Sequence, residues 1–506
     1  MLIPERIRKS LQAALASCEL DIPAEFQAEV TEAKNARFGD YQSNCAMALA
    51  RVVKRNPAEI AGIVAAQFDG GHLIARPEIA GGYLNFKLTD EGLASMVAGY
   101  LTDERLGVPK ADKSRTIAID FSAPNVAKPM HVGHIRSTII GDCLSRVAGF
   151  MGHEVITDNH IGDWGTQFGM IIYGWKNHLD EAALENDPIR ELLRIYREVN
   201  AKAKVDEKIL DTCRNELVKL QQGDEENHAI WKKTVELSLK GLNVIYDRLD
   251  VKFDHYLGES FYNDRLGPLV DDLVEKNLAR ESEGALCVFF PDEKGLEDHP
   301  AIVRKKDGGF NYTTSDLATI DYRCETWKTD AIWYVVGAPQ QLHFKQIFAA
   351  SRMRGVDANM AHIAHGSILG KDRKMMKTRS GDNVQLADVL DEAVGLALKV
   401  VEEKNPGLTP DEKEEISEVV GIGAVKFAEL SQHRMTDYIF DAEKMLSFQG
   451  ATAPYIQNAY VRTRSIFRKL GETPTFGDSM VLADPAERKL ALKLLRFGEL
   501  VHIVLG

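Results

Sequence analysis

The sequence predicts an α/β protein built on a parallel sheet, with a mixed α+β N-terminal part and an all-helical C-terminal part. Apolar strands alternate with amphipathic helices over residues 115–180 and again after residue 313, and such alternation is typical of parallel sheets. Charged helical segments and short strands separate the two stretches, which indicates an insertion at about 180–300. Beyond Asn405-Pro406 the apolar spacing is helical throughout. We therefore expect three parts: 1–110, 111–400 and 401–506.

Each element follows from its local pattern. The first twenty residues interleave apolar side chains and charges at helical spacing, which predicts an amphipathic helix and not a secretory signal. The expected strands are short β-branched or aromatic runs, namely GGYLNFKL (81–88), TIAIDFS (116–122), HEVITDN (153–159), LCVFF (286–290), AIWYVV (331–336) and AHIAHGSIL (361–369). A turn is expected at Asp307-Gly308-Gly309. Helices are expected from His131, after GDWG (162–165), over 180–250 as a charged hairpin, after Thr313, and from Gln340 to Arg354.

Composition excludes several classes of protein. The 506 residues carry 62 basic and 75 acidic side chains, a net charge of −13, which argues against unspecific coating of nucleic acid. Two local basic strips, 370–381 and 460–469, still allow contact with RNA. No apolar run is long enough to span a membrane. The six cysteines are scattered without a CxxC pair, so we expect neither zinc nor a disulfide framework, and a reducing cytoplasm fits.

The stretch PMHVGHIRSTIIGD (129–142) places two histidines where a helix should begin, after a strand and a loop. A helix N-terminus has unpaired N–H groups and the positive end of the dipole, so it suits a phosphate. His131 and His134 lie one turn apart and could both donate to phosphate oxygens, and Gly133 leaves room for a flat ligand. The pattern favours a nucleotide site, although two surface histidines near a helix end would show the same four letters.

A second stretch, KMMKT (374–378), lies in a basic loop after the last expected strand. Lys374 and Lys377 could close over the outer phosphates of a nucleotide and stabilise departing pyrophosphate. By itself the loop would equally suit a solvated turn. The pairing with the histidines is the stronger signal, because loops that follow the strands of one parallel sheet meet at its carboxyl edge, where ligands bind.

HVGH and KMMKT resemble the HIGH and KMSKS signatures of class I aminoacyl-tRNA synthetases, and the longer motifs resemble the arginyl-tRNA synthetase family. These are DFSAPNVAKPMHVGHIRSTIIGD (120–142), NHIGDWGTQFG (159–169) and KTRSGDNVQLADVLDEA (377–393). FGDYQSN (38–44) resembles the family's N-terminal tRNA-binding domain, and 441–469 resembles its helical anticodon-binding domain. The resemblance covers nearly the whole chain. It implies a Rossmann-like catalytic domain and a monomeric cytoplasmic enzyme whose partners are ATP, with its Mg²⁺, L-arginine and the tRNA for arginine.

A guanidinium needs carboxylates placed for bidentate bonds and neutral acceptors beside them. The chain offers Asp120 on the first strand, Tyr312 and Asp316 at a helix start, and Gln340 before the next helix. The resemblance assigns Tyr312, Asp316 and Gln340 to the arginine side chain, and Asn125 and the His131 region to its backbone end; Asp120 matches a position where the family carries Glu or Asp. It assigns ATP to His131, Gly133, His134, Lys374 and Lys377, with the histidines and lysines catalytic, and tRNA to Phe38, Tyr41, Gln42, Tyr455 and Arg462.

The resemblance further implies two steps. The arginine carboxylate attacks the α-phosphate of ATP, and the 2′-hydroxyl of the terminal adenosine of the tRNA then attacks the resulting adenylate. The tRNA is expected to be needed for efficient activation of arginine, and no editing of wrongly attached amino acids is expected. Two departures from the family stand out. Arg373 occupies a place where glycine is common, and the chain stops at Gly506, before further helices that the family usually has. We therefore expect an incomplete last domain.

Three other functions stay open at this point. A class I synthetase for glutamine, glutamate or cysteine would share the fold, although Tyr312 with Asp316 favours a cationic substrate. A small nucleotidylyltransferase would share HxGH but has no use for the terminal parts. A non-catalytic RNA-binding derivative would be expected to have lost a motif histidine or lysine, and none is lost.

Overall fold

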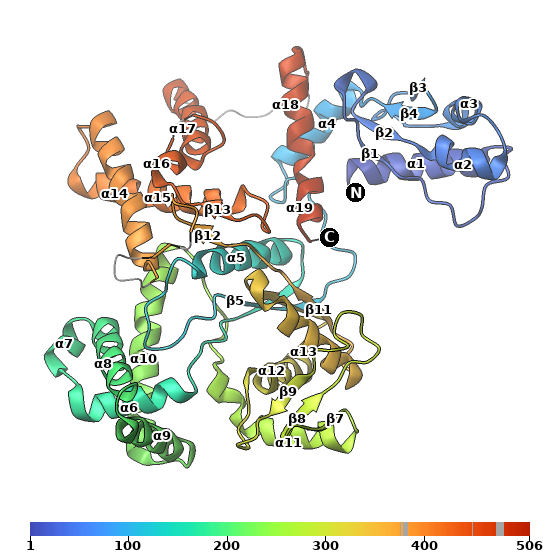
Figure 1. Ribbon diagram of the computed structural model, residues 1–506. Coiled ribbons are helices and arrows are strands. Elements are labelled where there is room, and N and C mark those ends of the chain that lie inside the picture. Colours follow the sequence, from blue (N-terminus) through green and yellow to red (C-terminus); the bar gives the residue numbers. More distant parts are fainter. Residues whose placement is uncertain (375, 378–382, 448, 472–479, 506) are drawn as a thin grey trace. The chain divides into compact units, whose positions relative to one another are not determined.

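The computed structural model describes residues 1–374, 376–377, 383–447, 449–471 and 480–505. The chain forms two compact units (Figure 1). Unit 1 comprises Met1–Asp112, Phe150–Gly152 and Leu470–Gly506, and unit 2 comprises Lys113–Gly149 and His153–Lys469. The predicted part boundaries at 110 and 400 stay predictions. Among the described residues no helix is long and apolar enough to cross a membrane.

Unit 1 is an α+β structure in which helices cover a small antiparallel sheet of order β1-β2-β4-β3. The predicted amphipathic helix is α1 (Ile3–Ser17), which buries Ile3, Ile7 and Leu11 at helical spacing. The C-terminal helices α18 (Pro485–Leu495) and α19 (Phe497–Leu505) belong to this unit, and α18 packs on α4. The other elements are β1 (Thr31–Glu32), η1 (Ala36–Phe38), β2 (Tyr41–Ser43), α2 (Cys45–Val53), α3 (Pro57–Gln67), β3 (Glu78–Ala80), β4 (Tyr83–Phe86) and α4 (Asp90–Leu101).

Unit 2 is organised around the predicted parallel sheet, whose strand order is β11-β10-β5-β6. Alternate residues of the central strand β5 (Thr116–Phe121) face opposite layers. Ala118 joins the core formed with α11, α12 and α13, whereas Phe121 lies against Gly141 of α5. In Figure 1, α5 lies on one side of these strands and α12 and α13 on the other. The other sheet strands and flanking helices are β6 (Glu154–Asp158), β10 (Ala331–Val335), β11 (Asn359–His362), α5 (His134–Phe150), α11 (Asn263–Glu275), α12 (Tyr312–Thr326) and α13 (Gln341–Met353).

The insertion begins as helices and continues as a small antiparallel sheet of order β7-β8-β9. The charged region forms the four helices α7, α8, α9 and α10. The predicted helical structure is therefore confirmed, but the predicted hairpin of two helices is wrong. An aspartate accepts a backbone N–H at each start, and these caps are Asp180, Asp187, Asp206 and Asp224. The elements are α6 (Thr166–His178), α7 (Glu181–Asn186), α8 (Pro188–Ala203), α9 (Glu207–Gln221), α10 (Glu225–Arg248), η2 (Glu259–Tyr262), β7 (Ala279–Ser282), β8 (Ala285–Val288) and β9 (Ala301–Arg304).

The segment predicted as one strand at 361–369 is divided. Its first part is the end of β11, and its last two residues form β12 (Ile368–Leu369), which pairs with β13 (Tyr438–Ile439) in another sheet. The break lies at Gly366, where a Cβ would meet Asp437 and Met435 at 3.0 Å or less. The described residues of the helical C-terminal part therefore include a short strand, β13. The remaining elements of unit 2 are η3 (Ala338–Gln340, before α13), α14 (Leu386–Lys404), α15 (Pro410–Leu430), α16 (Ala442–Met445) and α17 (Ala453–Leu470).

Candidate active site

The loop from β5 to α5 has an unusual backbone that its neighbours hold in place. Ser122, Ala123 and Ala127 have positive φ angles of 74°, 46° and 60°, a conformation that costs about 1 kcal/mol or more for each such residue. Hydrogen bonds from several elements compensate. Ser122 shares one of 2.8 Å with Tyr246 of α10, and the Ala127 N–H donates to the Ser238 Oγ at 3.0 Å. The long insertion helix therefore braces the loop that leads to HVGH.

The HVGH stretch is a turn followed by a helix. Helix α5 begins at His134 and not at His131 as expected, because residues 130–132 pair with residues 384–386 instead. The imidazole rings of His131 and His134 lie 4.0 Å apart. A Cβ on Gly133 would come within 2.9 Å of the His131 ring, so glycine is required for that ring to fold over the turn.

Both histidines use Nδ1 within the turn. The Gly133 N–H donates to Nδ1 of His131, and the His131 N–H donates to Nδ1 of His134, each at 3.1 Å. In a neutral imidazole an accepting Nδ1 leaves the proton on Nε2. Burial lowers the pKa of His131, and burial with the neighbouring His131 lowers the pKa of His134 to about 3. At neutral pH both rings are therefore neutral, and His131 donates through Nε2. Nδ1 of His134 also lies 3.2 Å from the His131 carbonyl, so Nε2 of His134 is a donor in the tautomer whose Nδ1 accepts the His131 N–H.

The basic loop is connected directly to the HVGH turn. The Val132 N–H donates to the Val384 carbonyl and the Leu386 N–H to the Met130 carbonyl, each at 2.9 Å. Lys377 pairs with Asn383 at the base of the loop. Lys374 and Lys377 are exposed, and Met375 and Thr378 of the motif lie outside the described residues. The two predicted phosphate-binding stretches are thus adjacent in space although some 240 residues apart in the sequence.

The residues predicted to bind the arginine side chain lie at the starts of α12 and α13. Asp316 accepts a hydrogen bond of 2.5 Å from Nε2 of His343 on α13. Tyr312 is the first residue of α12, is 62% exposed and packs its ring edge-on to His343 at 4.8 Å. Gln340 ends η3 and is exposed. These side chains therefore share one region, while Asn125 lies in the strained loop against Gly162.

Asp120 occupies a more structural position than the others. Asp120 is 4% exposed, and its carboxylate forms a 2.6 Å ion pair with Arg323 of α12, which also pairs with Asp158 at 2.8 Å. Burial raises the pKa of Asp120, and the guanidinium of Arg323 opposes this. Removing one partner of such a buried group leaves an uncompensated charge. Asp120 therefore also fastens α12, which carries Asp316, to the sheet.

Glu259 is a carboxylate of this region that the sequence analysis did not single out. It is the first residue of η2, the next element after α10, and its N–H donates to the Ile161 carbonyl. Burial raises its pKa to about 7, the charge of His160 opposes this, and the carboxylates of Asp316 and Asp163 add to it. The only local signal was the turn-like Gly258-Glu259-Ser260, which resembles many exposed turns. Its proximity to Asp316 becomes visible only in the fold.

The predicted tRNA-contacting residues differ in exposure. Tyr455 and Arg462 lie exposed on α17, whose only buried residues are Ala453 and Pro454. Phe38 and Gln42 are half-buried. Tyr41 is fully buried, and its hydroxyl donates to Glu499 at 2.5 Å. The expected surface position of Tyr41 is therefore wrong, because β2 lies between β1 and β4 and directs this side chain into the core of unit 1.

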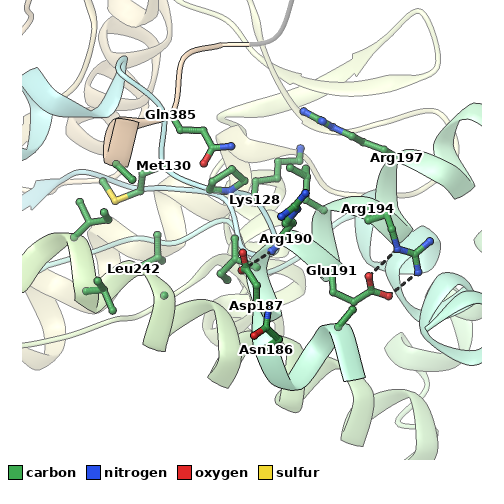
Figure 2. A pocket seen from close by; sticks show the side chains of 18 of the residues that line it. Lys128, Met130, Asn186, Asp187, Arg190, Glu191, Arg194, Arg197, Leu242 and Gln385 are labelled. Atoms are coloured by element: carbon green, nitrogen blue, oxygen red, sulfur yellow. Dashed lines mark hydrogen bonds and ion pairs between the residues drawn. The ribbon is translucent and has the colours of Figure 1, made fainter. Parts of the chain in front are cut away.

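A cavity of about 870 Å³ lies beside the HVGH turn but contains none of the predicted arginine or ATP residues. Figure 2 shows residues of its walls, which come from the loop before the histidines, α7, α8, α10 and the segment of Gln385, which pairs with His131. Its charges nearly balance, and Glu191 is bonded to Arg194. We therefore assign it no ligand. The charged side chains around it are Lys128, Asp180, Asp187, Arg190, Glu191, Arg194 and Arg197.

Comparison with known proteins places this arrangement in a family. Residues 96–442 match the model of the class I tRNA synthetases (R) catalytic domain. Residues 5–88 match the arginyl tRNA synthetase N-terminal domain. The first match contains every residue that we predicted for ATP and arginine, and the second contains the predicted tRNA residues of the N-terminal part.

Individual relatives agree with these matches. The chain is 44% identical over 513 residues to an arginine–tRNA ligase from Cellvibrio japonicus, covering 99% of this chain and 88% of that protein. It is 46% identical over 478 residues to one from Thermobifida fusca, covering 92% and 82%. The structure of arginyl-tRNA synthetase from Plasmodium falciparum matches with a TM-score of 0.82 at 28% identity, covering 99% of this chain and 88% of that one. On these grounds the chain belongs to the arginine–tRNA ligase family of class I aminoacyl-tRNA synthetases.

Proposed function

We propose that this chain joins L-arginine to its tRNA at the carboxyl edge of the β11-β10-β5-β6 sheet, with the residue roles given below. Membership of the arginine–tRNA ligase family supports the overall reaction. The observation that carries the assignment of the site is the pairing of residues 130–132 with 384–386, because it joins the histidine turn to the basic loop. Neither stretch alone would define a nucleotide site.

The first step is attack of the arginine carboxylate on the α-phosphorus of ATP, which forms arginyl-adenylate and releases pyrophosphate. His131 and His134 donate through Nε2 to the phosphate oxygens, and Lys374 and Lys377 stabilise the departing pyrophosphate. Such catalysis is positioning with electrostatic stabilisation and needs no covalent nucleophile on the enzyme. Mg²⁺ enters with ATP, held by phosphate oxygens and water, and we assign it no side chain.

Arginine recognition is assigned to the region between α12 and α13. Asp316 and Glu259 supply the carboxylates for the guanidinium, and Tyr312 and Gln340 flank it. Asn125 and the His131 region hold the backbone end, and Asp120 contributes at the sheet side. Lysine lacks the planar fork and would leave these acceptors unpaired, so discrimination should be large without editing.

In the second step the 2′-hydroxyl of the terminal adenosine attacks the acyl carbon of the adenylate, and AMP leaves. We assign tRNA contact to Tyr455 and Arg462 on α17, where the arginines alternate with exposed aromatic residues, and to Phe38 and Gln42 in unit 1. Tyr41 lies in the core of unit 1 and positions the neighbouring residues of that surface. We further propose that the chain acts as a monomer in the cytoplasm, which size-exclusion chromatography with light scattering and cell fractionation would test.

The test is arginine-dependent ATP–pyrophosphate exchange by this chain, with and without tRNA for arginine. We expect exchange with arginine, not with lysine, and strongly increased by tRNA. D316A should raise the arginine KM strongly while ATP still binds, because that carboxylate is the main partner of the guanidinium. Unchanged arginine KM in D316A would refute the arginine assignment, and unchanged exchange in H134A would refute the phosphate assignment.

A further inference from the structure

We propose that His343 is a positioning residue for the arginine site, which holds the carboxylate of Asp316 and the ring of Tyr312 in the orientation that receives a guanidinium. The inference rests on the proposed role of Asp316. It concerns a residue on a different helix, to which neither the sequence motifs nor the family matches assign a role.

The contacts of His343 join the two side chains that we assign to arginine. Its Nε2 lies 2.5 Å from Oδ2 of Asp316. A carboxylate only accepts, so the imidazole donates this hydrogen bond. Its ring meets the Tyr312 ring edge-on at 4.8 Å and the Phe344 ring at 5.5 Å. One side chain therefore fixes the direction of both Asp316 and Tyr312.

Burial makes this contact effective. The side chain of His343 is 11% exposed and that of Asp316 is 21% exposed, so little water competes for the bond. Nδ1 of His343 is buried and has no hydrogen-bond partner among the described residues. Within those residues, the bond to Asp316 is therefore the one hydrogen bond that holds the ring. Tyr312 is 62% exposed and so depends on a neighbour such as His343 for a defined orientation.

The hydrogen bond from His343 uses only part of the acceptor capacity of the Asp316 carboxylate. An ionised carboxylate can accept about four hydrogen bonds, and His343 occupies one of them. The remaining ones stay available for the fork of a guanidinium, whose bidentate geometry demands a fixed carboxylate plane. A freely rotating Asp316 would have to be ordered when arginine binds, at a cost in affinity.

A series of substitutions at one position tests this inference. H343Q retains a donor near the place of Nε2, whereas H343N offers one only near the place of Nδ1 and H343A offers none. We expect the arginine KM to rise about tenfold in H343A and H343N, the order of one hydrogen bond to a charged group, and to rise much less in H343Q. The kcat at saturating arginine and the ATP KM should change less than twofold.

Three outcomes would overturn the inference. A lower arginine KM in H343A would show that His343 competes with arginine for Asp316. A fall in kcat at constant KM would place it in the chemistry instead. Equal losses of thermal stability and activity in H343Q, H343N and H343A would show a purely structural role.

The variant D316A separates this inference from the site assignment. If D316A leaves the arginine KM unchanged, the assignment of Asp316 fails and the inference fails with it. If D316A raises the KM but the H343 series does not, the assignment stands and only the positioning role fails. In the double variant D316A/H343A the second change should add little, because His343 acts through Asp316.

Discussion

At the scale of single residues, Glu259 shows how burial brings a carboxyl group into the physiological range of pH. Burial raises its pKa to about 7, against the charge of His160 and reinforced by Asp316 and Asp163. Below that pH the group is protonated in the free enzyme and cannot pair with a guanidinium. Arginine binding should therefore be coupled to release of a proton.

We accordingly predict that the arginine KM rises as the pH falls below 7, by up to about tenfold per unit, and levels off above pH 8. E259Q should have a higher KM at pH 8 that hardly changes down to pH 6. Steady-state aminoacylation at several pH values measures both. A wild-type KM that is flat from pH 6 to 8 would show that Glu259 does not meet the guanidinium.

The titration of His134 is predicted to make the stability of the fold depend on pH. Burial and the neighbouring His131 lower its pKa to about 3, while the unfolded chain has a histidine pKa of about 6.5. Between these values the unfolded state binds a proton that the folded state excludes, so stability falls as the pH falls. H134Q lacks this titration. Relative to H134Q, the wild type should lose about 2 kcal/mol of unfolding free energy between pH 6.5 and pH 5; equal loss in urea titrations of both would contradict this.

At the scale of elements, the insertion helix α10 acts on the active-site loop through Tyr246. Its hydroxyl shares a hydrogen bond with Ser122 and accepts one of 2.9 Å from the Asn159 side chain. Both partners hold residues of the positive-φ loop, since the Asn159 Oδ1 also accepts the Ala123 N–H. Removing that hydroxyl leaves buried groups unpaired, and the strained loop should relax.

We predict that Y246F lowers the kcat of pyrophosphate exchange about tenfold and the unfolding free energy by 1 to 3 kcal/mol, roughly the cost of unpaired buried partners. The matched control is Y256F, which removes a 2.8 Å hydrogen bond to Asn243 that is exposed. Y256F should leave kcat within twofold. Comparable losses of kcat in both variants would show that the hydroxyl of Tyr246 has no special connection to the loop.

The elements also show what the sequence can predict. Alternating strands and helices predicted the parallel sheet, because a strand buried on both faces is recognisably apolar. The aspartate caps could have separated the four insertion helices. The positive φ angles of Ser122, Ala123 and Ala127 have no such signal, because none is glycine and only contacts from α5, α10 and Asn159 stabilise them. Arg373, at a place where the resembled family often has glycine, has a φ of 60°, a conformation that glycine adopts at lower cost.

The site residues also fall into two groups, those that local sequence motifs predict and those that only the fold brings to the site. His131, His134, Lys374 and Lys377 lie in local motifs that can be recognised from spacing, and their roles stay predictions. Glu259 and His343 lie in no motif. They reach Asp316 only because η2 and α13 pack against α12, which depends on the topology of the whole sheet. The predicted surface position of Tyr41 is wrong because a polar, glycine-containing stretch resembles a surface loop even when it forms a central strand.

At the scale of the whole molecule, unit 1 depends on helices that lie some 400 residues away in the sequence. Arg488 of α18 pairs with Asp40 at 2.7 Å and with Asp90 at 2.8 Å, and it also donates to the Leu88 carbonyl at 2.9 Å. Asp40 is 7% exposed, so its charge needs this partner. Contacts of such separation cannot be inferred from local pattern.

We predict that R488A destabilises unit 1 by roughly 2 to 4 kcal/mol, because it leaves the carboxylate of Asp40 buried without its partner. The exposed Lys493 on the same helix provides the control, and K493A should stay within about 0.5 kcal/mol. All five tryptophans of the chain belong to unit 2. Their fluorescence therefore follows unit 2 alone, whereas far-ultraviolet circular dichroism follows both units.

In urea, R488A should shift part of the dichroism change to lower denaturant and leave the fluorescence midpoint where it is in the wild type. This separation follows from the division of contacts into two units, each with its own core. If fluorescence and dichroism shift together, the units unfold as one, and the contacts of Arg488 then stabilise the whole chain. If neither shifts, Asp40 is solvated on loss of its partner, and the apolar contacts of Ala491, Leu492 and Leu495 are sufficient to hold α18 in place.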